Sequence, residues 1–284
     1  MTFHRAISHE PQAENETANP WVMHLCYLAA AWALIFMLLW RDVWAMASTY
    51  WNVSTYNHCL LIVPILVWLV QQRREELARI VPVGWVPGLL WIAAAATGWL
   101  IGEAAGVAFA RQLAVIMLLQ GSVITLLGPN VSRGLAFPLF YAFFLVPFGD
   151  EFVPALQSIT AKLSMVMLDW SNIPAHIEGV FISTPAGLFE VAEACSGVMF
   201  LIAMVAYGAL VCNLCFISPW RRAAFMAVSV ILPIIANGMR AFGTIYIAEF
   251  RGIEFAAGFD HIFYGWIFFA VILVLLMAIG WSNT

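Results

Sequence analysis

The sequence predicts an all-α polytopic membrane protein with about eight transmembrane helices. Of the 284 residues, 63% are hydrophobic and only 10% are charged, whereas a soluble domain carries about 25% charged residues. Apolar runs close to the roughly 20 residues needed to cross a bilayer recur along the whole chain. So much apolar surface cannot be hidden inside one water-soluble core, and the lipid bilayer is therefore the expected solvent.

The apolar runs define the predicted spans. In chain order these are residues 21–40, 58–70, 86–102, 113–127, 134–148, 196–216, 223–246 and 262–280. The second and fourth are short, and the fifth contains Pro138. The polar segment 1–20 does not have the composition of a cleaved signal peptide. We expect it to be a disordered cytoplasmic tail in front of a single transmembrane domain, 21–284.

The positions of the basic residues predict the orientation of the spans. Six arginines follow the second, fourth and sixth spans: Arg73, Arg74, Arg79, Arg133, Arg221 and Arg222. Loops rich in basic residues remain on the cytoplasmic side, which places both termini in the cytoplasm. The segment 149–193 is then extracytoplasmic, and Cys195, Arg240 and His261 all lie near that outer face.

The long outer segment contains two further predicted elements. Residues 152–170 have apolar side chains at near-helical spacing, which predicts an amphipathic helix in the outer interface, or alternatively a short re-entrant or spanning helix. Residues 173–192 alternate around the turn Thr184-Pro185-Ala186-Gly187 and predict a short β-hairpin. Its second strand runs directly towards Cys195. Such a hairpin can fix the height of the thiol and offer an edge strand to an extended peptide.

Cys195 is the candidate nucleophile. It lies between Glu193 and Ser196, immediately before an apolar helix. A helix N-terminus lowers the pKa of a thiol and so favours the reactive thiolate. The alternative is that Cys195 is a small apolar residue of the helix.

Arg240 and His261 complete the candidate site. Arg240 can donate hydrogen bonds to a thiolate, an oxyanion or a carboxylate, with Asn237 three residues earlier on roughly the same helix face. Arg240 can also simply reach the membrane interface. His261 follows Asp260 and is the preferred general acid or base. His58 and His176 are the rivals for this role.

The sequence does not indicate a metal, a cofactor or a nucleic acid as a partner. His58, His176, Cys195 and His261 are the possible zinc ligands, but no pair has a spacing such as H-E-x-x-H. No basic stripe for nucleic acid is present. The five cysteines, which are Cys26, Cys59, Cys195, Cys212 and Cys215, do not suggest a disulfide framework.

Three short blocks resemble, in order and spacing, those of the exosortase family, specifically the exosortase A group. They are 193–197 (EACSG), 237–240 (NGMR) and 260–266 (DHIFYGW). An earlier stretch, Tyr56-Asn57-His58, is also similar, and the resemblance covers about residues 40–281. The chain departs from the family pattern at 198–200, where a more polar segment is common, and at 57–59, where Ser-His-Gly is more usual.

The resemblance implies a multi-pass cysteine protease or transpeptidase of the bacterial inner membrane, with its active site on the periplasmic face. Such enzymes process exported proteins with a C-terminal PEP-CTERM sorting signal and a transmembrane anchor, and are linked to exopolysaccharide and biofilm production. They transfer the product to water or to an unknown acceptor and need no soluble cofactor. By motif, Cys195 is the nucleophile, Arg240 the stabiliser and His261 the acid or base. Glu193, Ser196, Asn237 and His58 would support them.

Two functions from other classes remain open. Arg240 and Asp260 near the outer face of a bundle of spans are compatible with anion binding by a transporter or channel subunit. The chain is also compatible with a non-catalytic assembly factor for polysaccharide export.

Overall fold

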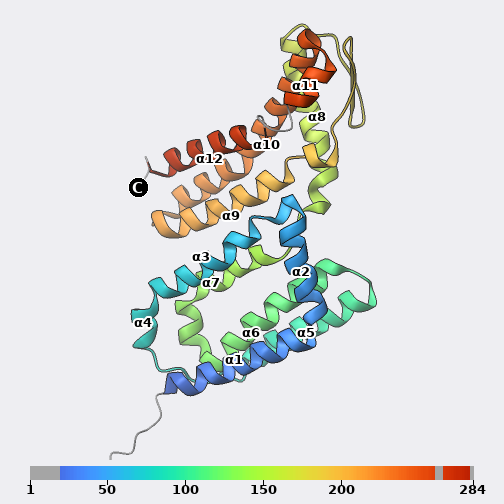
Figure 1. The fold of residues 1–284 in the computed structure, drawn as a ribbon. Helices are drawn as coiled ribbons and strands as arrows, with labels where there is room; N and C mark the ends of the chain where they lie inside the picture. Colours follow the sequence, from blue (N-terminus) through green and yellow to red (C-terminus); the bar gives the residue numbers. More distant parts are fainter. Residues whose placement is uncertain (1–19, 260–264, 282–284) are drawn as a thin grey trace, which may run out of the picture.

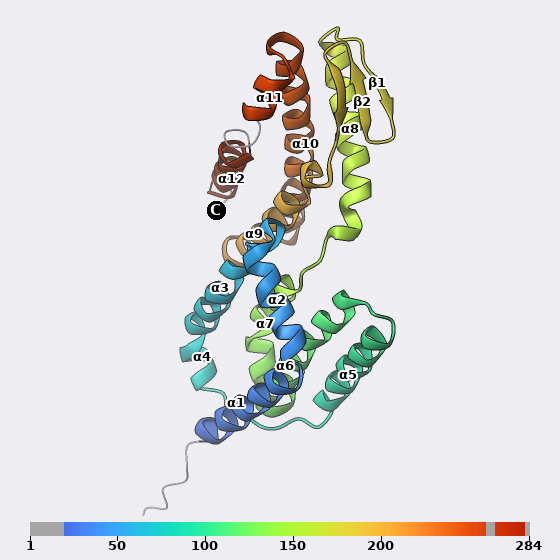
Figure 2. The same cartoon turned by 45° about the vertical axis from the view of Figure 1, so that its right-hand side comes forward.

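The computed structural model describes residues 20–259 and 265–281. The predicted tail, apart from Pro20, lies outside the described residues, and so does His261. The molecule is an elongated, almost entirely helical assembly (Figure 1). Helices α1 to α7 gather in its lower part, α8 and α10 to α12 in its upper part, and α9 lies between them in both ribbon views (Figures 1 and 2).

The lower part contains the first seven helices. In chain order these are α1 (Pro20–Leu38), α2 (Trp40–Asn52), α3 (Cys59–Gln72), α4 (Arg74–Ala78), α5 (Gly88–Ala104), α6 (Ala108–Gly134) and α7 (Ala136–Tyr141). Short 3-10 turns, η1 (Ser54–Tyr56) and η2 (Ala142–Leu145), precede α3 and follow α7. Helices α5 and α6 approach closely because glycines face their contact. A Cβ atom on Gly88 would lie only 2.5 Å from Oγ1 of Thr125.

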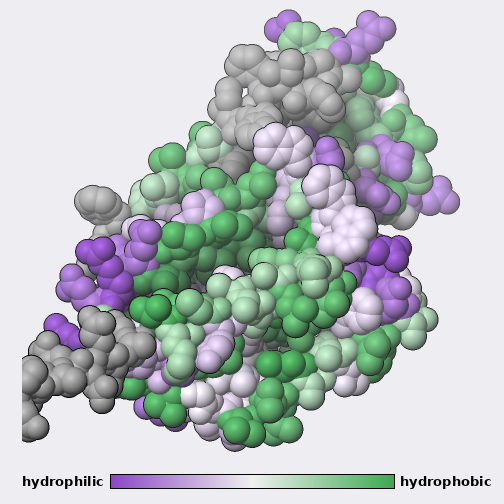
Figure 3. All heavy atoms as spheres, turned by 60° about the horizontal axis from the view of Figure 1, so that its bottom comes forward, coloured by the Kyte–Doolittle hydropathy of each residue, from purple (hydrophilic) through white to green (hydrophobic). Residues whose placement is uncertain are grey.

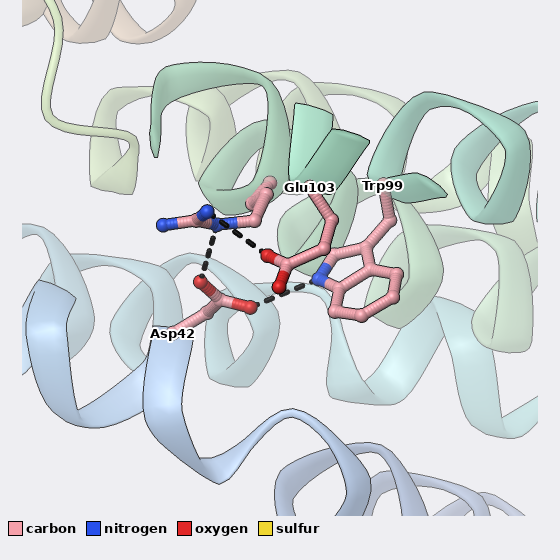
Figure 4. Close-up of polar contacts among 4 residues, drawn as sticks. Asp42, Trp99 and Glu103 are labelled. Atoms are coloured by element: carbon pink, nitrogen blue, oxygen red, sulfur yellow. Dashed lines mark hydrogen bonds and ion pairs between the residues drawn. The ribbon is translucent and has the colours of Figure 1, made fainter. Parts of the chain in front are cut away.

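A charged cluster joins α2, α5 and α6 (Figure 4). The Asp42 carboxylate, on a residue only 8% exposed, accepts hydrogen bonds from Nε of Arg111 at 3.0 Å and Nε1 of Trp99 at 2.9 Å. Arg111 also contacts Glu103 at 2.9 Å. A buried carboxylate is tolerated only when it is paired, so this cluster fixes the mutual positions of the three helices.

The upper part begins after a sharp bend. It comprises η3 (Asp150–Phe152), α8 (Val153–Trp170), η4 (Glu193–Cys195), α10 (Pro219–Arg251), α11 (Ile253–Phe259) and α12 (Gly265–Trp281), and α9 (Val198–Cys215) joins it to the lower part. Helix α10 packs against α8, α9, α11 and α12. Figure 2 shows α8 and α10 side by side. Their contact is close, because Oγ of Ser164 donates to the carbonyl of Gly238 at 3.3 Å.

The predicted hairpin is present and has one additional strand. Strands β1 (His176–Glu178), β2 (Phe181–Thr184) and β3 (Gly187–Glu190) form an antiparallel sheet in the order β1-β2-β3. Thr184 pairs with Gly187 around the predicted Pro185-Ala186 turn. The inner face of the sheet, including the fully buried Ile182, packs with side chains of α8 and α10.

The prediction of eight spans is not confirmed. Five helical stretches within the described residues are long and apolar enough to cross a membrane: Pro20–Leu38, Ser54–Gln72, Ala108–Gly134, Val198–Cys215 and Pro219–Arg251. A sixth arises only if Ala136–Leu145 and Asp150–Trp170 form one span, and they are bent by 67°. In the fifth predicted span the α-helix ends at Tyr141, where the 3-10 turn η2 and the extended residue Val146 follow. Helices α5 and α12, at 17 residues each, are shorter.

Helix α8 buries small and polar residues together with Leu156 and Leu168, and exposes other apolar side chains. Thr160 and Ser164 are 1% and 0% exposed, whereas Val166 and Trp170 are 47% and 78% exposed. The apolar positions of the predicted stripe are therefore divided between the protein interior and the surface. The small buried residues of α8 allow its close contact with α10. Figure 3 shows a face on which hydrophobic residues extend from the middle to the lower edge, with hydrophilic residues gathered at the sides.

Candidate active site

A pocket of about 90 Å³ lies between the end of β3, the η4 turn and the C-terminal half of α10. Its wall includes three residues singled out in the sequence, namely Cys195, Asn237 and Arg240. The remaining lining residues are Phe189, Glu190, Val191, Ala241, Thr244 and Ile245. Residues more than 40 positions apart in the chain thus meet around one thiol, because β3 runs alongside α10.

The backbone around Cys195 is sharply turned. The Cys195 amide donates to the Ala192 carbonyl at 2.8 Å, and the Ser196 amide donates to the Glu193 carbonyl at 3.0 Å, forming the η4 turn. Gly197 follows in the left-handed conformation, with a φ of +82°, before α9 begins. A Cβ atom at Gly197 would lie 2.6 Å from Cγ of Asn237, so only glycine fits this turn.

Asn237 holds this turn in place. It is only 4% exposed, and its Nδ2 donates to the Cys195 carbonyl at 2.8 Å and to Oγ1 of Thr160 at 2.9 Å. One side chain of α10 therefore connects η4 to α8. Thr160 was not identified from the sequence. The only signal was a polar residue among the apolar positions of segment 152–170, and such residues are common on helices.

Arg240 lies one helical turn beyond Asn237 and lines the same pocket as Cys195. It also borders a second, apolar hollow between α9, α10 and α12. That hollow is lined by Phe200, Met204, Pro233, Ala236, Asn237, Arg240 and Ile272. The guanidinium group thus belongs to a helix segment that has the thiol pocket on one side and an apolar surface on the other.

The other polar residues of the cysteine block have different surroundings. Ser196 is 2% exposed, and its Oγ accepts a hydrogen bond from the Val198 amide at 3.4 Å, at the first residue of α9. Glu193 is exposed and does not line the pocket, whereas Glu190 does.

The histidines occupy separate places. His58 lies before α3, where its Nδ1 contacts the Thr55 carbonyl at 3.1 Å and its Nε2 lies 3.7 Å from Sγ of Cys59. It does not line the Cys195 pocket. His176 is exposed on β1, the strand farthest from β3 in the sheet. His261 falls in the connection from α11 to α12, outside the described residues.

Metal binding has no support among the residues that the structure describes. In ranges 20–259 and 265–281, no three His, Cys, Asp or Glu side chains are grouped so that they can hold a metal ion. The chemistry available in the described pocket is that of a thiol, a guanidinium and a carboxylate.

The fold and the pocket define a multi-pass membrane protein with a thiol and a guanidinium in one pocket. Residues 50–278 match the family model described as transmembrane exosortase. The match covers most of the chain, and the protein therefore belongs to the exosortase family. No curated protein sequence and no solved structure matches it.

Proposed function

We propose that this exosortase is a cysteine protease or transpeptidase that cleaves C-terminal sorting signals of the PEP-CTERM type from exported proteins. It would act at the periplasmic face of a bacterial inner membrane, in a system linked to exopolysaccharide production. The observation that supports this proposal most strongly is the shared pocket of Cys195 and Arg240. The family match over both residues adds to it.

The reaction proceeds by nucleophilic acyl transfer. The Cys195 thiolate attacks the carbonyl carbon of the scissile peptide bond, and Arg240 donates hydrogen bonds to the resulting oxyanion. His261, having taken the thiol proton, gives it to the leaving amine as the C–N bond breaks. Water or an acceptor amine then attacks the thioester, transfers its proton to His261 and releases the thiolate.

The positioning groups in the structure suit this role. Asn237 binds the backbone carbonyl of Cys195 rather than pointing freely into the pocket. It therefore fixes the thiol relative to Arg240, and such fixed geometry accounts for a large part of enzymatic rate enhancement.

The proposal is tested by measuring the intact masses of exported membrane proteins. Cells with the wild-type enzyme are compared with cells that express Cys195→Ala at the same membrane abundance. We expect at least one protein to lose its C-terminal anchor only in wild-type cells. If the two sets of masses are the same, the protease function is wrong, and transport or assembly becomes the better account.

A further inference from the structure

The outer edge of β3 has unused backbone hydrogen-bonding groups. The Val191 amide donates to the Val180 carbonyl at 2.9 Å. Two residues earlier, Phe189 of β3 is paired with Ile182 of β2. Because such pairs alternate along antiparallel strands, the N–H and C=O groups of Leu188 and Glu190 point away from β2. No other described residue forms a backbone hydrogen bond with them.

This edge leads into the pocket that contains Cys195. Phe189, Glu190 and Val191 form one wall, and the opposite wall on α10 contains the small side chains of Ala241 and Thr244. A short extended backbone beside β3 would therefore point towards the thiol.

The opposite end of the edge is closed. At the tip of the hairpin, the Glu249 carboxylate of α10 accepts hydrogen bonds from the Ala186 amide at 3.1 Å and from Oγ1 of Thr184 at 3.3 Å. Ile253 of α11 lies against Gly187, where an added Cβ atom would be 2.8 Å from its Cδ1. These contacts limit an added strand to a few residues beside Leu188 and Glu190.

Strand β3 contains neither a lysine nor a proline at this edge. Natural edge strands are commonly shielded by lysine, proline or a bulge. Strand β3 has the sequence Gly-Leu-Phe-Glu, and its Leu188 is 67% exposed. Glu190 is its only charged residue.

We propose that the substrate binds here as an added β-strand, with the residues before its scissile bond paired to the outer edge of β3. This inference rests on the proposed function. Strand addition uses main-chain hydrogen bonds for affinity, so it accepts different side chains in the bound segment. The site would thus recognise an extended backbone near an anchor.

The strand direction follows from the path of the chain after Cys195. Strand β3 runs towards Cys195, and α9, a candidate membrane span, continues from there. A substrate whose anchor helix follows the scissile bond must enter the same apolar layer. Its preceding segment therefore runs parallel to β3, from the hairpin tip towards the thiol.

The first test compares Glu190→Pro with Glu190→Ala. Both substitutions remove the carboxylate, but only proline also removes the backbone N–H that points away from β2. The pairing of β3 with β2 does not use this N–H. The probe is the exported protein that keeps its anchor in Cys195→Ala cells. We expect Glu190→Pro to process it about three- to tenfold more slowly than Glu190→Ala, the effect of one main-chain hydrogen bond. Equal rates, at equal abundance and equal alkylation of Cys195, would overturn the proposal.

The second test is independent of activity. A photoreactive residue replaces Leu188 or Glu178 in the Cys195→Ala enzyme. The register places these positions on the same face of the sheet but at opposite edges. We expect an adduct with the substrate from position 188 and not from 178.

The outcomes separate the two proposals. Normal processing by Cys195→Ala contradicts the proposed function. If Cys195→Ala blocks processing but positions 188 and 178 give equal adducts or no adduct, the protease function stands. Only the strand-addition proposal is then contradicted.

Discussion

The turn that holds Cys195 depends on Gly197. The substitution Gly197→Ala measures how much stability and activity are lost when this glycine is replaced. The left-handed conformation at a φ of +82° costs an alanine about 1–2 kcal/mol. The new Cβ atom would also lie 2.6 Å from Cγ of Asn237. Asn237 must then move, and it has two hydrogen bonds to lose, at 2.8 Å to Cys195 and 2.9 Å to Thr160.

Together, these effects predict a substantial loss of folding stability. Each hydrogen bond contributes about 0.5–1.5 kcal/mol, so the total destabilisation is about 2–5 kcal/mol. Because the displaced group holds the nucleophile, we expect substrate processing to fall by about ten- to a hundredfold even in the folded fraction. The assay is the rate of anchor removal per unit of membrane-inserted enzyme, together with the alkylation rate of Cys195.

Gly106→Ala is the matched control. Gly106 also has a positive φ, +68°, but a Cβ atom there would have no neighbour within 4 Å. The control therefore introduces similar backbone strain without displacing Asn237. If Gly197→Ala and Gly106→Ala process substrate at the same rate, the argument that Asn237 positions the nucleophile is refuted.

Four further predictions concern other parts of the structure. Thr160→Val removes one acceptor of Asn237, and we expect a loss of stability of about 1 kcal/mol with a severalfold slower reaction, measured by thermal unfolding and anchor removal. Arg240→Lys keeps the charge but loses the planar fork, so processing should fall about 10²–10³-fold at wild-type abundance; near-normal processing would mean that Arg240 only anchors its helix. His261→Ala should lose about 10²–10⁴-fold in rate and His58→Ala much less, and the reverse order would show that the base is misassigned. Asp42→Asn weakens the cluster that joins three helices, and detergent-solubilised protein should unfold at a lower temperature while Cys195 in the folded protein is alkylated at an unchanged rate.

The sequence predicted local features well. The alternation around Pro185-Ala186 located the hairpin and its turn, since a strand pattern and a turn are both short-range properties. The spacing of Asn237 and Arg240 predicted that they lie on roughly the same face of one helix, and both line the Cys195 pocket.

Features that depend on distant contacts were not predictable in this way. The bond from Asn237 to Thr160 joins α10 to α8, and no spacing in the sequence indicates it. Eight spans are not confirmed, because α5 and α12 have only 17 residues each and α7 ends at Tyr141, inside the fifth apolar run. His58 resembled a possible partner of Cys195 because both flank apolar runs, yet their helices place them in different surroundings.

The central claim is that Cys195 forms a covalent bond with the substrate, and trapping that intermediate tests it most directly. Hydroxylamine attacks a thioester and leaves a hydroxamate on the released acyl group. Membranes containing the wild-type enzyme and its substrate should therefore yield the substrate's N-terminal fragment with a C-terminal hydroxamate, as detected by mass spectrometry, and Cys195→Ala membranes should yield none. A fragment that ends in a free carboxylate despite abundant hydroxylamine, or a hydroxamate that persists in Cys195→Ala membranes, would contradict the claim.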